Sequence, residues 1–186
     1  MRIELPKSLS DGVVTLRPLR EDDVPPMLAA FRDDPELGAA IGVEEDPAED
    51  ALLARVGRAA DDAAEGVAVE LAIASADGDE LLGTMALVRF DWRHGRCEIG
   101  FWLAPQARRQ GLGRRATALA LDWAFDELHM RRVEISTLPE NEATMALARS
   151  LGFAEEGLLR QRNFERGQAV DVVWFGMLRD EWPNAT

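Results

Sequence analysis

The sequence has few of the residues that support metal, disulfide or histidine chemistry. Its 186 residues include one cysteine, two histidines and no tyrosine. Cys97 has no second cysteine with which to form an intramolecular disulfide, and one thiol is too few for a cysteine-rich zinc site. His94 and His129 lie far apart in the chain, so we predict neither a metal centre nor a histidine-based catalytic triad.

Long apolar runs are also absent. Residues 1–10 contain Arg2, Glu4 and Lys7 without an apolar core, and no run of about 18 apolar residues occurs anywhere. We therefore expect neither secretion nor a membrane span. The single thiol suits a reducing compartment, so the expected location is the cytoplasm.

Basic residues are outnumbered, with 21 Lys and Arg against 34 Asp and Glu, which gives a formal net charge of -13. Such a field repels the phosphates of nucleic acid, so we expect no nucleic-acid partner. Cationic partners are favoured instead. The sequence leaves open whether the chain forms a homodimer.

Residue patterns predict a single α/β domain over residues 1–186. Strands are expected at residues 13–19, 67–74, 81–90, 97–103, 132–138, 154–162 and 169–178. Helices are expected after Asp23 and over residues 49–64, 111–129 and 141–150, the last with Asn141 as N-cap and Gly152 as its C-terminal stop. The acidic segment 33–50 is expected to be a loop, either solvated or acting as a lid.

The clearest chemical signal is the segment Arg108-Arg109-Gln110-Gly111-Leu112-Gly113, between a strand and a long helix. Glycines at 111 and 113 allow backbone N–H groups to approach a phosphate, and the first turn of the helix adds the positive end of its dipole. With Arg114 and Arg115, four arginines surround these groups in an acidic chain. The segment therefore predicts an anion site, whereas a tight turn with solvated arginines is the simpler alternative. It matches neither the nucleoside-triphosphatase loop nor the dinucleotide-binding glycine pattern.

Arg108-x-x-Gly111-x-Gly113 resembles the cofactor motif Gln/Arg-x-x-Gly-x-Gly/Ala of the GNAT superfamily of N-acetyltransferases. From about residue 10 to Trp182 the chain resembles the ribosomal-protein-alanine acetyltransferase branch. The further segments that carry this resemblance are residues 15–19 (Thr-Leu-Arg-Pro-Leu) with Asp22-Asp23, 98–103 (Glu-Ile-Gly-Phe-Trp-Leu), 141–144 (Asn-Glu-Ala-Thr) and 151–153 (Leu-Gly-Phe) followed by Glu156-Gly157. Arg109 departs from the glycine of many relatives, and we expect binding to survive this difference.

The resemblance implies an α/β fold with a mixed, mostly antiparallel sheet of about seven strands, a splayed central strand pair and helices on both faces. It implies acetyl transfer from acetyl-CoA, without a metal. The strand at residues 98–103 would leave backbone groups, above all those of Phe101 and Leu103, free to pair with the pantetheine arm. The cofactor-binding residues that it implies are Phe101, Trp102, Leu103, Arg108, Arg109, Gln110, Gly111, Leu112, Gly113, Arg114 and Asn141.

Two residues are candidates for proton transfer. Glu98 would accept a proton from the amine, directly or through water; alternatively, it is an ordinary cross-strand charge near Arg96, and the amine arrives already deprotonated. Thr144 is the candidate acid for the leaving thiolate, because the tyrosine that many GNAT enzymes use is missing. Asn141 is interpreted either as a helix cap alone or also as a contact of the pantetheine arm.

The acceptor is expected to be a primary amine. The branch suggests the N-terminal α-amine of a protein such as a ribosomal protein, whose basic tail would suit the acidic surface. A cationic small molecule and a noncatalytic acyl-CoA-binding module remain alternatives. Asn163 stands where some branch members have glutamate, and Asp171 is interpreted as an anchor of its strand rather than an acceptor contact.

Overall fold

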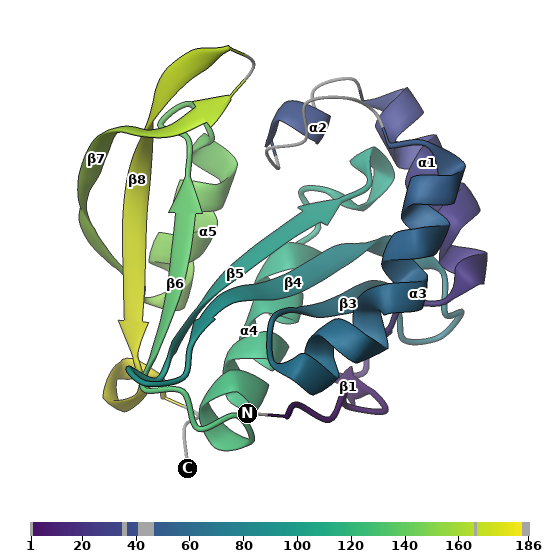
Figure 1. Cartoon of the computed structure of the whole chain (residues 1–186), viewed down its shortest axis with the longest axis horizontal. Helices are drawn as coiled ribbons and strands as arrows, with labels where there is room; N and C mark the ends of the chain where they lie inside the picture. Colours follow the sequence, from purple (N-terminus) through teal and green to yellow (C-terminus); the bar gives the residue numbers. More distant parts are fainter. Residues whose placement is uncertain (1, 35–36, 41–46, 166, 184–186) are drawn as a thin grey trace.

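The computed structural model describes residues 2–34, 37–40, 47–165 and 167–183 (Figure 1). These residues form an eight-stranded sheet in the order β1-β2-β3-β4-β5-β6-β8-β7. The strands are β1 (Leu9–Ser10), β2 (Val14–Pro18), β3 (Val69–Ser75), β4 (Leu81–Asp91), β5 (Arg96–Leu103), β6 (Arg132–Thr137), β7 (Ala154–Glu165) and β8 (Gln168–Leu178). Only β5 and β6 pair in parallel, so the predicted mixed, mostly antiparallel α/β sheet is confirmed. The eighth strand is the two-residue β1.

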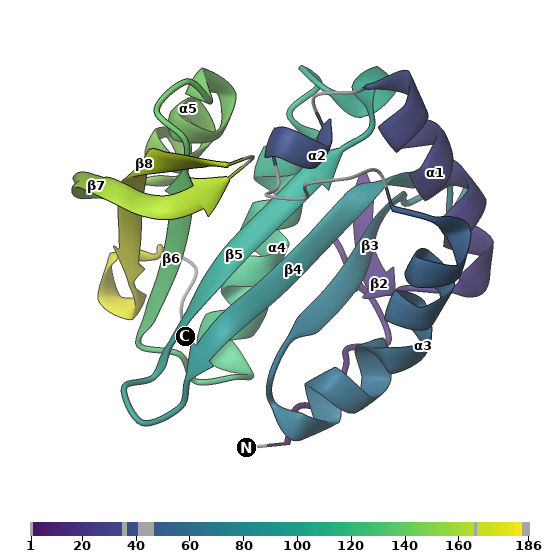
Figure 2. The same ribbon diagram turned by 45° about the horizontal axis from the view of Figure 1, so that its top comes forward.

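The helices cover both faces of the sheet, as predicted. They are α1 (Val24–Asp33), α2 (Leu37–Ala40), α3 (Glu49–Glu65), α4 (Leu112–Asp126) and α5 (Glu142–Leu151), with short 3-10 turns η1 (Glu21–Asp23), η2 (Pro105–Ala107) and η3 (Arg179–Glu181). Figure 2 shows α1 and α3 in front of the sheet and α4 behind it. None of the described helices is both long enough and apolar enough to cross a membrane.

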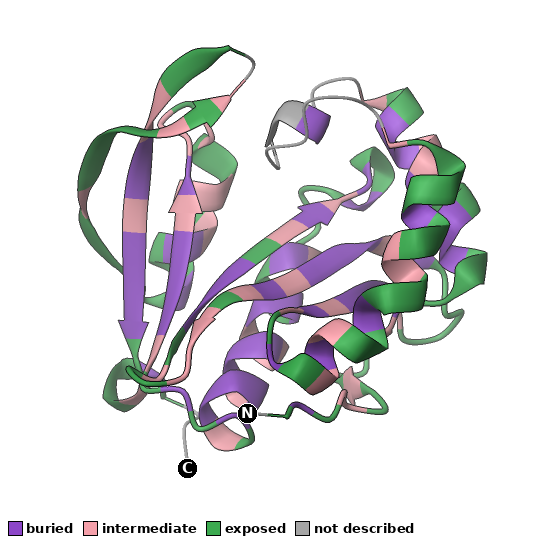
Figure 3. Ribbon diagram, in the orientation of Figure 1, coloured by how far each residue is buried: buried purple, intermediate pink, exposed green. Residues whose placement is uncertain are grey.

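Strand alternation divides the core between the two faces. On β5, Cys97 and Ile99 belong to the larger hydrophobic cluster, which includes the buried residues of α4. Trp102 points the other way and joins the smaller cluster, which includes the buried residues of α1. Its indole ring lies 5.8 Å from the ring of Phe31 between centroids. Figure 3 shows buried stretches in β5, β6 and β8, whereas the edge strand β7 is mostly exposed.

The segment at residues 33–50 differs from the expected loop. Residues 37–40 form the single turn α2, and Glu49 already begins α3. The loop prediction is therefore wrong for residues 37–40, because a helix of four residues is too short to show a helical period in the sequence. The lid interpretation falls largely on residues 35–36 and 41–46, which lie outside the described residues.

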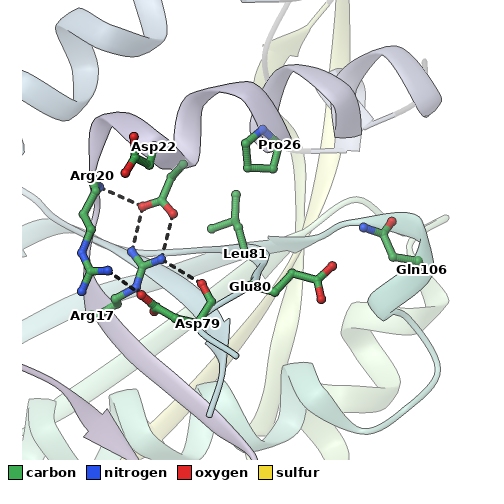
Figure 4. Close-up of a pocket in the computed structure, with 9 residues that line it drawn as sticks. Arg17, Arg20, Asp22, Pro26, Asp79, Glu80, Leu81 and Gln106 are labelled. Carbon is green, nitrogen blue, oxygen red and sulfur yellow. Dashed lines mark hydrogen bonds and ion pairs between the residues drawn. The ribbon is translucent and has the colours of Figure 1, made fainter. Parts of the chain in front are cut away.

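A buried ion pair joins the N-terminal elements to the β3–β4 turn. Arg17, at the end of β2, donates two hydrogen bonds to the carboxylate of Asp23, both of 2.8 Å. Its Nε donates to Asp79 in the turn. Figure 4 shows these side chains converging in a pocket that Gln106 also lines. In this pocket the guanidinium of Arg17 is hydrogen-bonded to the carboxylates of Asp23 and Asp79, so we interpret these three residues as a structural ion-pair cluster.

Candidate active site

Strand β5 pairs with β4 continuously from Glu98 to Leu103, but with β6 over only part of its length. Its parallel ladder with β6 contains three pairs: Arg96 with Arg132, Cys97 with Val133, and Glu98 with Glu134. Beyond Glu98 the two strands diverge (Figures 1 and 2). We call residues 99–103 the unpaired segment of β5. The splayed central strand pair that the resemblance implied is therefore present.

The register of β5 against β4 decides which backbone groups face the divergence. The amide of Ala104 donates to the carbonyl of Leu82 across 2.8 Å. Because antiparallel pairs alternate, Trp102, which pairs with Thr84, directs its backbone groups toward β4. Phe101 and Leu103 direct theirs to the opposite side, where β6 has moved away. Of the three β5 residues predicted to bind the cofactor, Trp102 alone is not brought to this side.

The loop that follows β5 presents the start of α4. Gly111 has a φ of 77° and is the N-cap residue of α4, with no side chain that could cap the helix. The first backbone bond of the helix runs from the amide of Arg115 to the carbonyl of Gly111. The amides of Leu112, Gly113 and Arg114 come before this bond in the chain, so they are the groups that a helix start offers to an anion.

Gly113 has a packing role that its motif does not reveal. It is buried, and a Cβ atom there would lie 3.1 Å from Cε2 of Phe101 and 3.3 Å from Cδ1 of Leu147. The missing side chain lets the first turn of α4 lie directly against β5 and α5. Gly113 thus brings together the loop, the unpaired segment and α5.

The four arginines of the loop fall into two groups. Nε of Arg108 donates to the carbonyl of Leu103 (2.9 Å), and its Nη2 lies 2.6 Å from Oδ2 of Asp34 at the end of α1. Arg115 pairs with Asp11 (2.7 Å). Within the described part of the chain, Arg109 and Arg114 are exposed and have no ion-pair partner. The latter two are therefore the cations available to a phosphorylated ligand.

The start of α5 lies beside this loop. Asn141 is the N-cap residue, and its Oδ1 accepts a hydrogen bond from the amide of Thr144 (3.1 Å), as the capping prediction required. Thr144 is half-buried and precedes Leu147 by three residues, so both lie on one side of the helix. Since Leu147 contacts the first turn of α4, Thr144 lies on the side of α5 that faces the loop.

Glu98 occupies the point where β5 and β6 part. It is 8% exposed. Oε1 accepts a hydrogen bond from the hydroxyl of Ser136 on β6 (2.5 Å), and Oε2 accepts one from Nη1 of Arg89 on β4 (2.7 Å). Glu98 therefore forms a cross-strand ion pair, but with Arg89. Arg96, the partner considered from the sequence, pairs with Asp91 (3.2 Å).

Sequence reasoning did not identify Arg89, Ser136 or Asp34. Arg89 has a φ of 53° and sits where the β4–β5 register shifts, so a bulge directs its side chain. Ser136 was only part of a predicted strand, and its partner comes from a strand 38 residues earlier. The alternation of β6 places Ser136 on the same face as Glu134, but the sequence carries no signal for the contact with Glu98.

The remaining candidates lie on the outer hairpin of the sheet. Oδ1 of Asp171 accepts a hydrogen bond from the amide of Gln161 (2.8 Å) beside a bulge of β7, which supports its interpretation as an anchor. Asn163 donates to Glu165 (3.2 Å). In the described part of the chain, His, Cys, Asp and Glu form no group of three that would hold a metal ion.

Comparison with known proteins identifies the family. A family model described as an acetyltransferase (GNAT) domain matches residues 14–154. The chain belongs to the GNAT acetyltransferases. This GNAT protein is 31% identical over 171 residues to the uncharacterized N-acetyltransferase p20 of Bacillus licheniformis, across 91% of this chain and 94% of the relative.

Two further relatives match about half of their own length. A proposed ribosomal N-acetyltransferase of Bacillus subtilis (strain 168), YdaF, is 32% identical over 102 residues, covering 55% of this chain and 56% of the relative. The spermidine N(1)-acetyltransferase of Escherichia coli (strain K12) is 32% identical over 101 residues, covering 54% of each. The solved structure of Mycobacterium smegmatis RimJ in complex with CoA-disulfide aligns with a TM-score of 0.89 at 24% identity, over 100% of this chain and 93% of that chain.

Family membership makes this GNAT protein an N-acetyltransferase that depends on acetyl-CoA. The enzyme is thereby favoured over the noncatalytic module. The site fits the cosubstrate on its own geometry, because uncapped helix amides and two unpaired arginines adjoin an unpaired strand edge. The names of these relatives point to different acceptors, a ribosomal substrate for YdaF and spermidine for the Escherichia coli enzyme.

Proposed function

We propose that this protein transfers the acetyl group of acetyl-CoA to the N-terminal α-amine of a basic protein or peptide. The observation that carries the proposal is the unpaired segment of β5, which begins beside a buried carboxylate and leads into a loop with free amides and cations. An extended pantetheine arm and a pyrophosphate have complementary chemistry to these two parts.

The binding end of the site is formed by α4 and its loop. The amides of Leu112, Gly113 and Arg114 would hold the pyrophosphate, with Arg109 and Arg114 adding charge. The backbone of Phe101, and the amide of Leu103, would pair with the arm in the manner of an added strand. The carbonyl of Leu103 already accepts from Arg108, so we assign Arg108 to holding the loop in place rather than to the phosphate.

The reacting end lies between Glu98 and α5. A backbone N–H of the unpaired segment would polarise the thioester carbonyl while the amine nitrogen forms the new C–N bond. As the C–S bond breaks, the hydroxyl of Thr144 would donate a proton to the departing sulfur. Glu98 would accept the proton that the amine loses, directly or through water. Thr144 would regain a proton from water and Glu98 would release its proton to solvent, so both side chains return to their starting states.

The charge of the chain supports a cationic acceptor, since a net charge of -13 attracts basic peptides and polyamines alike. Two observations favour the peptide: the chain resembles the ribosomal-protein branch over nearly its whole length, and YdaF is named a ribosomal N-acetyltransferase. The spermidine relative, at a similar identity, makes a polyamine the second candidate.

A thiol-release assay distinguishes these acceptors. The protein is mixed with acetyl-CoA and a panel of basic peptides with free or blocked N-termini, spermidine and an aminoglycoside. Burial raises the pKa of Cys97 to about 12, so this thiol adds no background to the native protein. We expect release only with free N-termini. Thiol release with spermidine alone would identify a polyamine as the acceptor. If none of the amines caused thiol release, the proposal would be contradicted.

Two variants test the proton-transfer roles. Glu98→Gln should lower kcat/KM about 100-fold near pH 7, because general-base catalysis contributes at least that much. Glu70→Gln is its matched control, since Glu70 also pairs with an arginine, Arg55, but on β3. Wild-type rates for Glu98→Gln between about pH 6 and pH 9 would exclude a base role.

Thr144→Val should lower kcat at least about tenfold while the affinity for acetyl-CoA changes by less than about twofold. The same change at Thr15, on β2, is the control. Unaltered turnover in Thr144→Val would show that the leaving thiolate needs no hydroxyl from this helix.

A further inference from the structure

Gly100, in the middle of β5, has no side chain on the face where Glu98 stands. Residues 98, 100 and 102 share this face, which is opposite to α4. Gly100 is exposed, whereas Glu98 and Trp102 on either side of it are 8% and 5% exposed. Among the described residues, no atom outside its chain neighbours lies within 4 Å of a Cβ built at Gly100.

Packing and backbone conformation do not explain this glycine. A Cβ at Gly83 would lie 2.0 Å from the carbonyl oxygen of Trp102, and one at Gly113 would crowd Phe101, so those two positions require glycine. Gly100 has neither a close neighbour nor a positive φ. Glycine weakens a strand interior, where β-branched residues pack better, and it often marks a bulge, a bend, or the close approach of a ligand or another backbone. The pairing of Gly100 with Ala86 is regular, so no bulge explains it.

The surroundings of Gly100 are those of the reacting end. Glu98 lies two residues earlier, with Ser136 of β6 on one carboxylate oxygen and Arg89 of β4 on the other. The side chain of Arg89 is 56% exposed, whereas that of Glu98 is nearly buried. Water therefore reaches the arginine that pairs with Glu98. Ala86, which pairs with Gly100 on β4, keeps the adjacent position small.

We infer that Gly100 determines acceptor specificity: the space above it receives the carbon that bears the acceptor amine, so that the nitrogen reaches Glu98. This inference rests on the proposed acetyl transfer and adds the position of the acceptor. The cationic amine takes over the place of Arg89 on Oε2 of Glu98, whereas Ser136 keeps Oε1 and fixes the carboxylate. A substituent on the amine-bearing carbon then points at the Cα of Gly100.

The test varies the two facing groups together. Gly100→Ala and Gly100→Val are compared with the wild type on basic peptides that begin with Gly, Ala or Val, with Gly57→Ala as the control. Gly57 lies in α3, has open space around it among the described residues, and has no positive φ. Acetyl-CoA affinity and the thermal midpoint are measured for every variant.

We expect Gly100→Val to lower kcat/KM at least about tenfold, equivalent to about 1.4 kcal/mol, with acetyl-CoA affinity within about twofold of wild type. Gly100→Ala should penalise the Val-initiated peptide more than the Gly-initiated one. If Gly100 had only a general structural role, the substitutions would lower kcat/KM equally for all peptides. A dependence on the size of the first residue therefore separates steric exclusion from misfolding. Equal rates in wild type and Gly100→Val, or a parallel loss of acetyl-CoA binding, would overturn the inference.

Binding of the peptide to the complex with CoA, which carries no acetyl group, is measured by calorimetry as a readout without turnover. If the wild type binds the peptide and Gly100→Val does not, the role of Gly100 is supported even when acetyl transfer itself fails. Unchanged peptide binding in Gly100→Val contradicts that role even if transfer succeeds. The failure of the subsite and the failure of the proposed function therefore give different results.

Discussion

Arg109 adopts a backbone conformation that ordinarily belongs to glycine. Its φ is 60°, in the left-handed region, two residues before Gly111, the N-cap of α4. A residue with a Cβ atom pays about 1–2 kcal/mol there. By the family resemblance many GNAT enzymes have glycine at this position, whereas the arginine of this chain places a cation near the free amides of α4 and strains the backbone.

Replacing Arg109 with glycine should therefore raise the stability of the protein but lower its affinity for acetyl-CoA. We expect Arg109→Gly to raise the thermal midpoint by about 2–4 °C, as relief of roughly 1 kcal/mol does in a chain of this size. Affinity for acetyl-CoA should fall severalfold because one cation is lost. Scanning calorimetry and equilibrium binding give the two values, and Arg114→Gln, which loses a cation without a change of φ, is the control. An unchanged affinity would remove Arg109 from the phosphate site.

Residue roles were predictable where both partners lie close together in the chain. Asn141 and the amide of Thr144 are three residues apart, and the cap followed from residue type and spacing. The surroundings of Glu98 come from three strands, and Asp34 reaches Arg108 from the end of α1. No local pattern encodes such contacts, because the fold brings their members together.

At the scale of elements, β4 and β5 approach more closely than a pair of ordinary residues permits. Gly83 lies opposite Leu103, and a Cβ there would overlap the backbone of Trp102. This contact lies at the Leu103 end of the unpaired segment, where β5 leads into the loop before α4.

Gly83→Ala should therefore destabilise the protein by about 1–3 kcal/mol, because the neighbouring backbone has to move. Chemical denaturation measures this difference. Gly78→Ala, in the nearby β3–β4 turn, meets only Ser75 Oγ at 3.5 Å and should change stability by much less. Equal stabilities of the two variants would show that β4 and β5 separate easily here.

Most elements follow from sequence patterns, with exceptions that have physical causes. Strand patterns predicted every strand from β2 to β8, helical spacing predicted α3 and α4, and residues typical of helix ends predicted α1 and α5. The two-residue β1 and the single turn α2 are too short to produce a period. The family resemblance implied a splayed central strand pair, but neither it nor the sequence patterns specified that β5 pairs in parallel with β6 or that this ladder ends at Glu98. Chain order does not determine where a ladder stops.

At the scale of the whole molecule, the excess of acidic residues should act on association. A net charge of -13 draws cationic acceptors toward the protein, and salt screens this attraction over about 10 Å at 0.1 M ionic strength.

We expect kcat/KM for a strongly basic peptide to fall as ionic strength rises from about 20 to 300 mM, with most of the effect in KM. A neutral peptide with the same first residues should show little change. Steady-state rates at saturating acetyl-CoA give the comparison. The same salt dependence for both peptides would mean that the surface charge does not select the acceptor.

Three residue pairs of β5 and β6 join the two parts of the sheet, β1 to β5 and β6 to β8, which also share the larger hydrophobic cluster with α4 and α5. A cosubstrate lying along residues 99–103 would supply the missing rungs of this ladder. The amides of Phe101 and Leu103 should then exchange with solvent deuterium quickly in the free protein and slowly in the complex. The bound cosubstrate would then form part of the sheet of the enzyme that acts on it.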